Sequence, residues 1–235
     1  MWDPQWETFT RAHRVLRYDL RGFGRSPLTP GRFSYGRDLV ELLDREGFER
    51  LSLVGVSMGG RVALEVALAR PDLVEALVLV GAGLPDHDWS GEMNALGRAE
   101  EAALDRGDVD AAAEVAVRGW VDGPRRKPED VDPAVRAKVA EMQRRAYELQ
   151  LPVWESATED RLVQDLAARL GEVGVPTLIV VGEEDLPDMH QIGERLQREI
   201  PNARRATIAG AAHVPSMERP REFDELVLGF LEEVR

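Results

Sequence analysis

The chain has 235 residues, 43% of them hydrophobic, and contains no cysteine. That length fits one α/β domain or two smaller ones with a buried core, and the absence of thiols excludes disulfides, thiolate metal sites and a cysteine nucleophile. The net charge of -13 opposes binding to nucleic acid or anionic lipid, and no apolar run reaches the length of a membrane span. We therefore expect a cytoplasmic protein that acts on a small molecule.

The first third of the chain predicts helices and strands in alternation. Asp3 and Pro4 suit the start of a helix, as its cap and first residue, and Gly47 suits the end of a second helix. In chain order the predicted elements are a helix over 3–12, a strand over 14–18, a glycine-rich turn over 21–27, a helix over 34–46, a strand over 51–56, and a helix that follows Ser57 and ends at Pro71.

Two later apolar runs, residues 76–80 and 177–181, are typical of parallel strands that are buried on both faces. Residues 205–208 form a weaker run, and apolar residues at helical spacing after Pro220 predict a final amphipathic helix. Strands that alternate with helices in this way indicate the α/β class, with a doubly wound, mostly parallel sheet.

The middle of the chain has a different pattern. Residues 92–121 and 133–149 are charged, alanine-rich and helical in character, with no convincing strand nearby, and residues 122–128 are a candidate hinge. A helical insertion between two strands can cover the end of a sheet, which is where α/β folds bind ligands. We expect residues 1–83 and 174–235 to form the core and residues 84–173 to form a helical cap.

The main chemical motif is Gly55-Val56-Ser57-Met58-Gly59. It follows an apolar strand and precedes a small-residue helix, which predicts a sharp turn that exposes the Ser57 hydroxyl. Such a turn requires glycine on both sides, because a side chain there would collide across it. The Met58 N–H would point to the same place and supply one oxyanion donor. The alternative is a turn serine without a catalytic role.

A serine nucleophile needs a base, and four histidines compete for that role. His213 is favoured because it lies in a loop after the last weak strand. His13 and His190 lie in predicted helices and are expected to be structural. His87 follows the strand that ends at Val80, so it could contact a substrate without acting as the base.

The third group must orient the imidazole, which requires a carboxylate at the end of a neighbouring strand. Asp185 is favoured, because it comes three residues after Gly182, where the apolar run ends. Several other acids lie in the same loop or after the preceding strand and remain alternatives: Glu183, Glu184, Asp188, Asp86 and Asp88.

Aromatic and sulfur-containing side chains in and before the helical segment are candidates for lining a substrate site. Trp89, His87 and Trp154 are the predicted substrate contacts, with Trp120 and Met142 as further candidates. The alternative for each is packing between the cap and the core.

Four segments together resemble one family: residues 18–26, the turn around Ser57, residues 182–185 and residues 210–213. They are similar to the capped α/β-hydrolase superfamily, and within it to bacterial serine hydrolases of the 3-oxoadipate enol-lactonase or carboxylesterase type. The resemblance implies a triad of Ser57, Asp185 and His213, a Met58 oxyanion donor, no cofactor and no metal. It further implies cleavage of an ester or lactone through an acyl-enzyme.

The sequence departs from this family in one respect. Members carry, before the helix that resembles residues 3–12, a strand ending in a His-Gly loop that supplies the second oxyanion donor, and this sequence has no counterpart. We expect the first strands of the fold to be absent, with Met1 an internal methionine of a longer natural chain. The loss of one donor typically lowers turnover about 10²–10³-fold.

Two other classes of function remain alternatives. One is a cofactor-free lyase, dioxygenase or C–C hydrolase, and the other is a non-catalytic protein.

Overall fold

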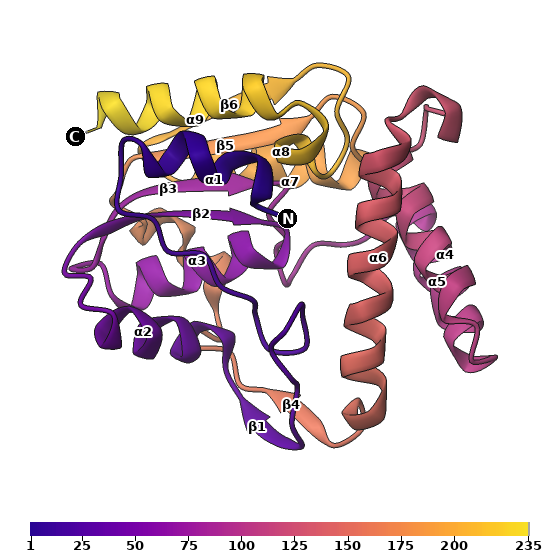
Figure 1. Cartoon of the computed structure of the whole chain (residues 1–235). Coiled ribbons are helices and arrows are strands. Elements are labelled where there is room, and N and C mark those ends of the chain that lie inside the picture. The colour runs from indigo at the N-terminus through magenta and orange to yellow at the C-terminus, as the bar shows by residue number, and fades with distance from the viewer. Residues whose placement is uncertain (235) are drawn as a thin grey trace.

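The main sheet of the protein consists of four parallel strands in the order β2-β3-β5-β6. These are β2 (Leu51–Val56), β3 (Val74–Val80), β5 (Thr177–Gly182) and β6 (Ala203–Ile208) in a computed structural model that describes residues 1–234. Figure 1 shows the four strands side by side with helices around them. The prediction of a parallel α/β sheet is therefore confirmed.

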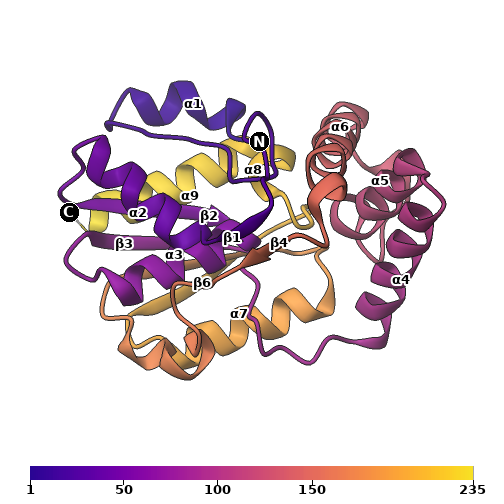
Figure 2. The same ribbon diagram turned by 90° about the horizontal axis from the view of Figure 1, so that it is seen from below.

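Helices cover both faces of this sheet (Figure 1 and Figure 2). One face carries α2 (Tyr35–Arg45), α3 (Met58–Ala69) and α7 (Pro187–Glu199), and the other carries α1 (Asp3–Thr10) and α9 (Pro220–Glu233). Along β3, Leu77 and Leu79 pack on the first face, whereas Val78 and Val80 pack on the second. Burial on both faces explains why the central strands are almost continuously apolar.

The predicted strand over 14–18 was wrong, because these residues have no regular secondary structure. Two arginines tether the segment instead of a backbone ladder. Arg14 donates to the carbonyls of Glu46 and Gly47 and stacks on Phe48. Arg17 pairs with Asp3 and lies over the Trp6 ring.

One side of β2 has no strand partner among residues 1–234. The segment 14–18 has not moved in to pair with it, so the backbone groups on that side of β2 form the edge of the sheet. The proposal that the chain begins late stays a prediction.

A second, two-stranded sheet was not foreseen. It pairs β1 (Gly31–Phe33) with β4 (Ala157–Glu159) in parallel. β4 lies in the stretch where the sequence predicted no strand. Each strand has three residues, too few to produce a periodic pattern. Arg61 attaches β4 to α3, because it binds both Glu65 within α3 and Glu159 at the end of β4.

Between β3 and β5 the chain is mostly helical, with α4 (Gly91–Asp105), α5 (Val109–Val117) and α6 (Pro133–Gln150). We call residues 91–150 the α4–α6 segment. It lies beyond the ends to which the strand arrows point (Figure 1). The predicted helical stretch 92–121 is divided at Gly107, whose φ of 70° ends α4, and Asp108 caps α5. The domain limits at 83 and 173 stay a prediction.

Shorter elements complete the chain. They are the π-helical turn η1 (Arg118–Asp122), the 3-10 turns η2 (Pro128–Asp130), η3 (Leu151–Val153) and η4 (Leu166–Glu172), and the one-turn helix α8 (Pro215–Glu218). Among the described residues, no helix combines the length and apolar character needed to cross a membrane.

Candidate active site

Ser57 lies at the sharp turn between β2 and α3. Its φ of 54° is the only positive φ of a non-glycine residue in the described chain. Such a conformation costs about 1–3 kcal/mol and persists only where the surroundings enforce it. Here the Ser57 N–H donates to the Val80 carbonyl at 2.8 Å, which fixes the turn against the end of β3. Met58 is the first residue of α3, so its N–H has no acceptor within the helix.

The glycines around this turn are not equivalent. A Cβ on Gly55 would lie 2.3 Å from the Gly59 carbonyl oxygen, and one on Gly60 would lie 2.6 Å from the Ala82 Cβ. A Cβ on Gly59 would meet no atom within 4 Å. The expectation that close contact requires glycine on both sides is confirmed for Gly55 and was wrong for Gly59, where the position points into open space.

His213 and Asp185 form a buried pair. The imidazole Nδ1 donates to Asp185 Oδ2 at 2.9 Å, and the other carboxylate oxygen accepts the Leu186 N–H at 2.9 Å. Asp185 is fully buried in the turn after β5, and His213 lies in the loop after β6. With Nδ1–H bound to a carboxylate, Nε2 is the nitrogen free to accept a proton. This Nε2 is buried and has no hydrogen-bond partner among the described residues.

Two neighbours fix the position of the imidazole. Gly81 follows Val80 directly, and a Cβ there would lie 2.9 Å from both Cε1 and Nδ1 of His213. The ring therefore lies against the same strand end that binds the Ser57 N–H. The Trp120 ring also approaches the imidazole, with centroids 4.3 Å apart, and the Trp120 carbonyl accepts the His213 N–H at 3.0 Å.

The alternative acids near Asp185 have other partners. Glu183 accepts the Gly210 N–H, and Glu184 pairs with Arg125. Asp86 forms a two-pronged ion pair with Arg195 of α7, with distances of 2.9 and 3.1 Å. None of these three carboxylates is a partner of His213 in the described chain, whereas Asp185 is.

A second Asp-His pair lies next to the first. Asp188 is buried at the start of α7, and it accepts hydrogen bonds from His87 Nε2 at 3.1 Å, the Ser90 N–H at 2.8 Å and the Ser90 hydroxyl at 2.7 Å. Burial alone would raise the pKa of Asp188, but the bonds from Ser90 and His87 outweigh it and hold that pKa below its usual value. Because Ser90 caps α4, Asp188 attaches the start of the α4–α6 segment to α7.

The sequence matches the α/β hydrolase fold family over residues 1–220. The chain belongs to this family. It is 30% identical to the putative carbamate hydrolase RutD of Azorhizobium caulinodans, over 99% of this chain and 86% of that protein. It is 24% identical to 3-oxoadipate enol-lactonase 1 of Acinetobacter baylyi, over 100% of this chain and 85% of that protein. A solved hydrolase from Pseudomonas aeruginosa has a TM-score of 0.75 at 31% identity, covering 98% of this chain and 84% of that chain.

These relatives confirm the predicted family and fold class, and they support an enzyme of the α/β-hydrolase family. Within this family member, Ser57, Asp185 and His213 come from three separate strand ends. The structure brings Asp185 and His213 into direct contact and packs His213 against the strand end that binds Ser57.

The predicted substrate contacts are in three different environments. Trp89 lines an open cavity of about 300 Å³ beside α4, together with Met93, Asn94, Gly97, Arg98 and Glu101. His87 is bound to Asp188 and packs edge-on against Trp89, with ring centroids 4.9 Å apart. Trp154 follows α6 and is 66% exposed, unlike Trp89 and Trp120, which pack against the core.

The remaining histidines lie away from this arrangement: His13 is in the turn after α1 rather than in a helix, and His190 is on α7. Among the described residues, no group of three or more histidine or acidic side chains is arranged to hold a metal ion.

Sequence reasoning missed several residues that contact the His213 loop. Gly81, Arg126 and Glu218 carried no motif, and Arg126 lies in a stretch that the sequence predicted only as a hinge. Trp120 was a candidate for substrate contact, whereas its position against His213 depends on the fold. No local signal could have linked Arg126 to residues more than 80 positions later in the chain.

Proposed function

We propose that the protein is a serine hydrolase that cleaves an ester or lactone of a small organic molecule, with Ser57 as nucleophile, His213 as base and Asp185 as the orienting acid. The observation that carries this proposal is the buried His213–Asp185 pair, whose imidazole packs against Gly81 at the strand end that binds the strained Ser57 and whose Nε2 has no partner among the described residues. The family and its hydrolase relatives support the reaction class.

In this mechanism the Ser57 oxygen attacks the substrate carbonyl while His213 Nε2 takes the hydroxyl proton. The imidazolium that forms is stabilised by Asp185, which accepts from Nδ1. The oxyanion binds the Met58 N–H at the start of α3, where the helix dipole favours negative charge. His213 then protonates the leaving alcohol, and a water molecule activated by the same Nε2 releases the acid from Ser57.

The α4–α6 segment acts in this proposal as a cap that selects the substrate. It lies beyond the strand ends, and its first helix borders the cavity lined by Trp89. Carbamates belong in the substrate survey because one relative carries that name. A cytoplasmic location and the absence of a cofactor stay predictions.

The test is labelling with a fluorophosphonate, which modifies an activated serine and needs no knowledge of the substrate. We expect labelling of the wild type and none of Ser57→Ala. Ser52→Ala is the matched control, since Ser52 lies on β2, five residues before Ser57, and is half-buried. Labelling that persists in Ser57→Ala would refute the assignment of the nucleophile.

A panel of short esters, lactones and carbamates then follows release of acid. Labelling of Ser57 together with no turnover of any panel member would reject the ester or lactone assignment. That result would favour the alternatives with the same triad: a lyase, a dioxygenase or a C–C hydrolase.

A further inference from the structure

The loop that carries His213 is held by the α4–α6 segment rather than by the sheet alone. The π-helical turn η1 brings Trp120 against it, where the Trp120 carbonyl accepts the His213 N–H at 3.0 Å. Next to this turn, Gly123 approaches the other loop of the pair, because a Cβ there would lie 2.1 Å from the Glu184 carbonyl oxygen. Residues 120–123 therefore contact both the His213 loop and the Asp185 loop.

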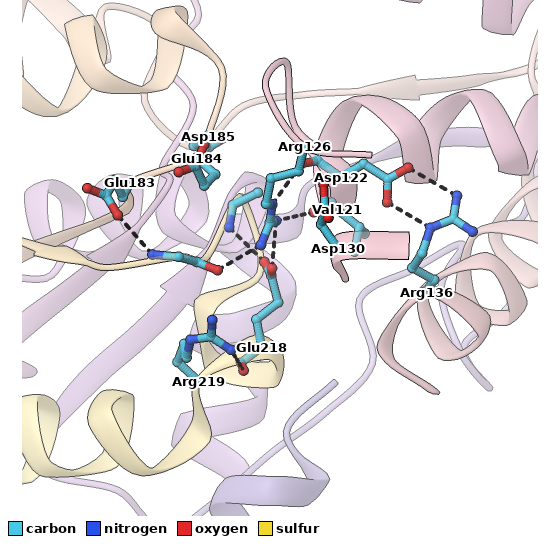
Figure 3. Close-up of polar contacts among 12 residues, drawn as sticks. Val121, Asp122, Arg126, Asp130, Arg136, Glu183, Glu184, Asp185, Glu218 and Arg219 are labelled. Carbon is cyan, nitrogen blue, oxygen red and sulfur yellow. Dashed lines mark hydrogen bonds and ion pairs between the residues drawn. The ribbon is translucent and has the colours of Figure 1, made fainter. Parts of the chain in front are cut away.

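Arg126 connects these parts (Figure 3). Its guanidinium donates to two carbonyls of η1, those of Val121 and Asp122, and to the Gly210 carbonyl at 2.7 Å. It also pairs with Glu218 of α8 at 2.7 Å. Four acceptors from three parts of the chain thus share one planar group, an arrangement that the fixed donors of arginine allow and a lysine cannot reproduce.

Glu218 extends this connection to the residue before His213. Its side chain is 3% exposed; one carboxylate oxygen pairs with Arg126, and the other accepts the Ala212 N–H at 2.8 Å. Burial raises the pKa of Glu218, and the nearby Arg126 guanidinium opposes this by stabilising the ionised form. Without Arg126 the buried carboxylate would lose its ion-pair partner, which proteins rarely tolerate.

We propose that Arg126 is a positioning residue for His213: by holding Gly210 directly and Ala212 through Glu218, it fixes the loop that places the imidazole against Gly81 and Trp120. The inference rests on the proposed function, since it assigns the support of the proposed base. Four of the five N–H donors of Arg126 are bound to protein acceptors and its side chain is 13% exposed, so we infer that it acts through the loop and does not bind substrate.

The experiment compares Arg126→Met and Arg126→Lys with Arg136→Met. Arg136 of α6 also holds η1, because it binds the Asp122 carboxylate at 2.7 and 3.1 Å. It makes no hydrogen bond or ion pair with the described residues of the His213 loop. All three variants weaken the attachment of η1, but only the Arg126 variants also release Gly210 and Glu218. Arg126→Lys keeps the positive charge near Glu218 and guards against a failure of Arg126→Met to fold.

Two readouts are needed. The first is kcat and KM on a short activated ester, and the second is backbone hydrogen exchange in the peptide that contains Ala212 and His213. We expect both Arg126 variants to lower kcat about 10²-fold, the cost of a misplacement near 1 Å, with KM changed less than threefold. Their Ala212 and His213 amides should exchange faster than in the wild type. Arg136→Met should keep kcat within threefold and leave this exchange unchanged.

The outcomes separate the two proposals. Wild-type protein without ester turnover or Ser57 labelling would reject the proposed function, while faster exchange confined to the Arg126 variants would still support the positioning role. Unchanged exchange at Ala212 and His213 in the Arg126 variants would overturn it. So would an equal loss of kcat in the Arg126 and Arg136 variants, because that result would mean only a general loosening of the α4–α6 segment.

Discussion

Gly81→Ala tests the placement of the imidazole with a single methyl group. The new Cβ would lie 2.9 Å from Cε1 and Nδ1 of His213, and ordinary contact begins at 3.4 Å, so the ring or the strand end must move by about half an ångström. The same methyl group would lie 3.4 Å from Asp185 Oδ2, which accepts from the imidazole Nδ1, so it would be placed beside the His213–Asp185 bond.

Two separable effects follow from this substitution. The φ of Gly81 is 46°, and a residue with a Cβ in this left-handed region costs about 1–2 kcal/mol of stability. The displaced imidazole affects catalysis instead. Because a misplacement of about 1 Å can lower a rate about 10²-fold, we expect a loss of kcat/KM of about 10- to 100-fold for the smaller shift.

The assay measures ester hydrolysis and thermal unfolding side by side, with Gly47→Ala as the control. Gly47 ends α2 with a φ of 67°, and a Cβ there would meet no atom within 4 Å. Both variants should therefore lose the stability that the left-handed backbone costs, Gly81→Ala more because of its close contacts with His213, but only Gly81→Ala should lose activity. If Gly81→Ala hydrolyses esters as fast as Gly47→Ala, His213 does not act from this position and the reasoning about its surroundings is refuted.

Two further predictions concern the turn at Ser57 and the start of the α4–α6 segment. Gly55→Ala should lower the free energy of unfolding by about 1–3 kcal/mol, because its Cβ would overlap the Gly59 carbonyl, whereas Gly59→Ala should leave it unchanged or raise it; equal losses in a denaturant titration would contradict this. Asp188 has a lowered pKa in the folded state, so it stabilises the protein above its unfolded pKa of about 3.9 and that contribution is lost as the pH falls. The stability difference between wild type and Asp188→Asn should therefore be full at pH 7 and shrink below about pH 4, and a constant difference would contradict the lowered pKa of Asp188.

The parts of the fold that the sequence predicted are those in which a local pattern and burial agree. β2, β3 and β5 are apolar because helices cover both faces of the sheet, and α9 shows its apolar stripe at helical spacing. The prediction of a strand over 14–18 was wrong because a short run with two adjacent apolar residues and an aromatic residue also suits a strand, and only tertiary contacts of Arg14 and Arg17 decide its path. The sequence did not predict β1 and β4, because a strand of three residues is too short to show a periodic pattern.

In the candidate site, too, the sequence predicts the residues that have a local pattern and misses those placed by contacts between distant segments. Ser57 follows from a local motif, and Asp185 and His213 follow from their positions after strands, although only the structure distinguishes Asp185 from its acidic neighbours by its contact with His213. The residues that hold the His213 loop in place could not be predicted from the sequence. Trp120, Arg126 and Glu218 meet the His213 loop through contacts between segments far apart in sequence, and nothing in their local context differs from an ordinary surface stretch.

Under the proposed function, the turn η1 that follows α5 has two roles. Residues near Trp120 would help to cover the substrate, and they also carry the carbonyl that holds the His213 N–H. A substitution that reshapes this part of the α4–α6 segment to admit a different substrate would therefore move the base as well. Trp120 and Arg126 lie in this segment and also hold the loop that carries His213. The first helix of the segment is free of this constraint: α4 is attached through Ser90 to Asp188, which hydrogen-bonds to His87 and Ser90 and not to His213. Under the proposed function, substitutions at α4 around Trp89 and Met93 should therefore change the substrate range with less effect on the imidazole than substitutions at η1.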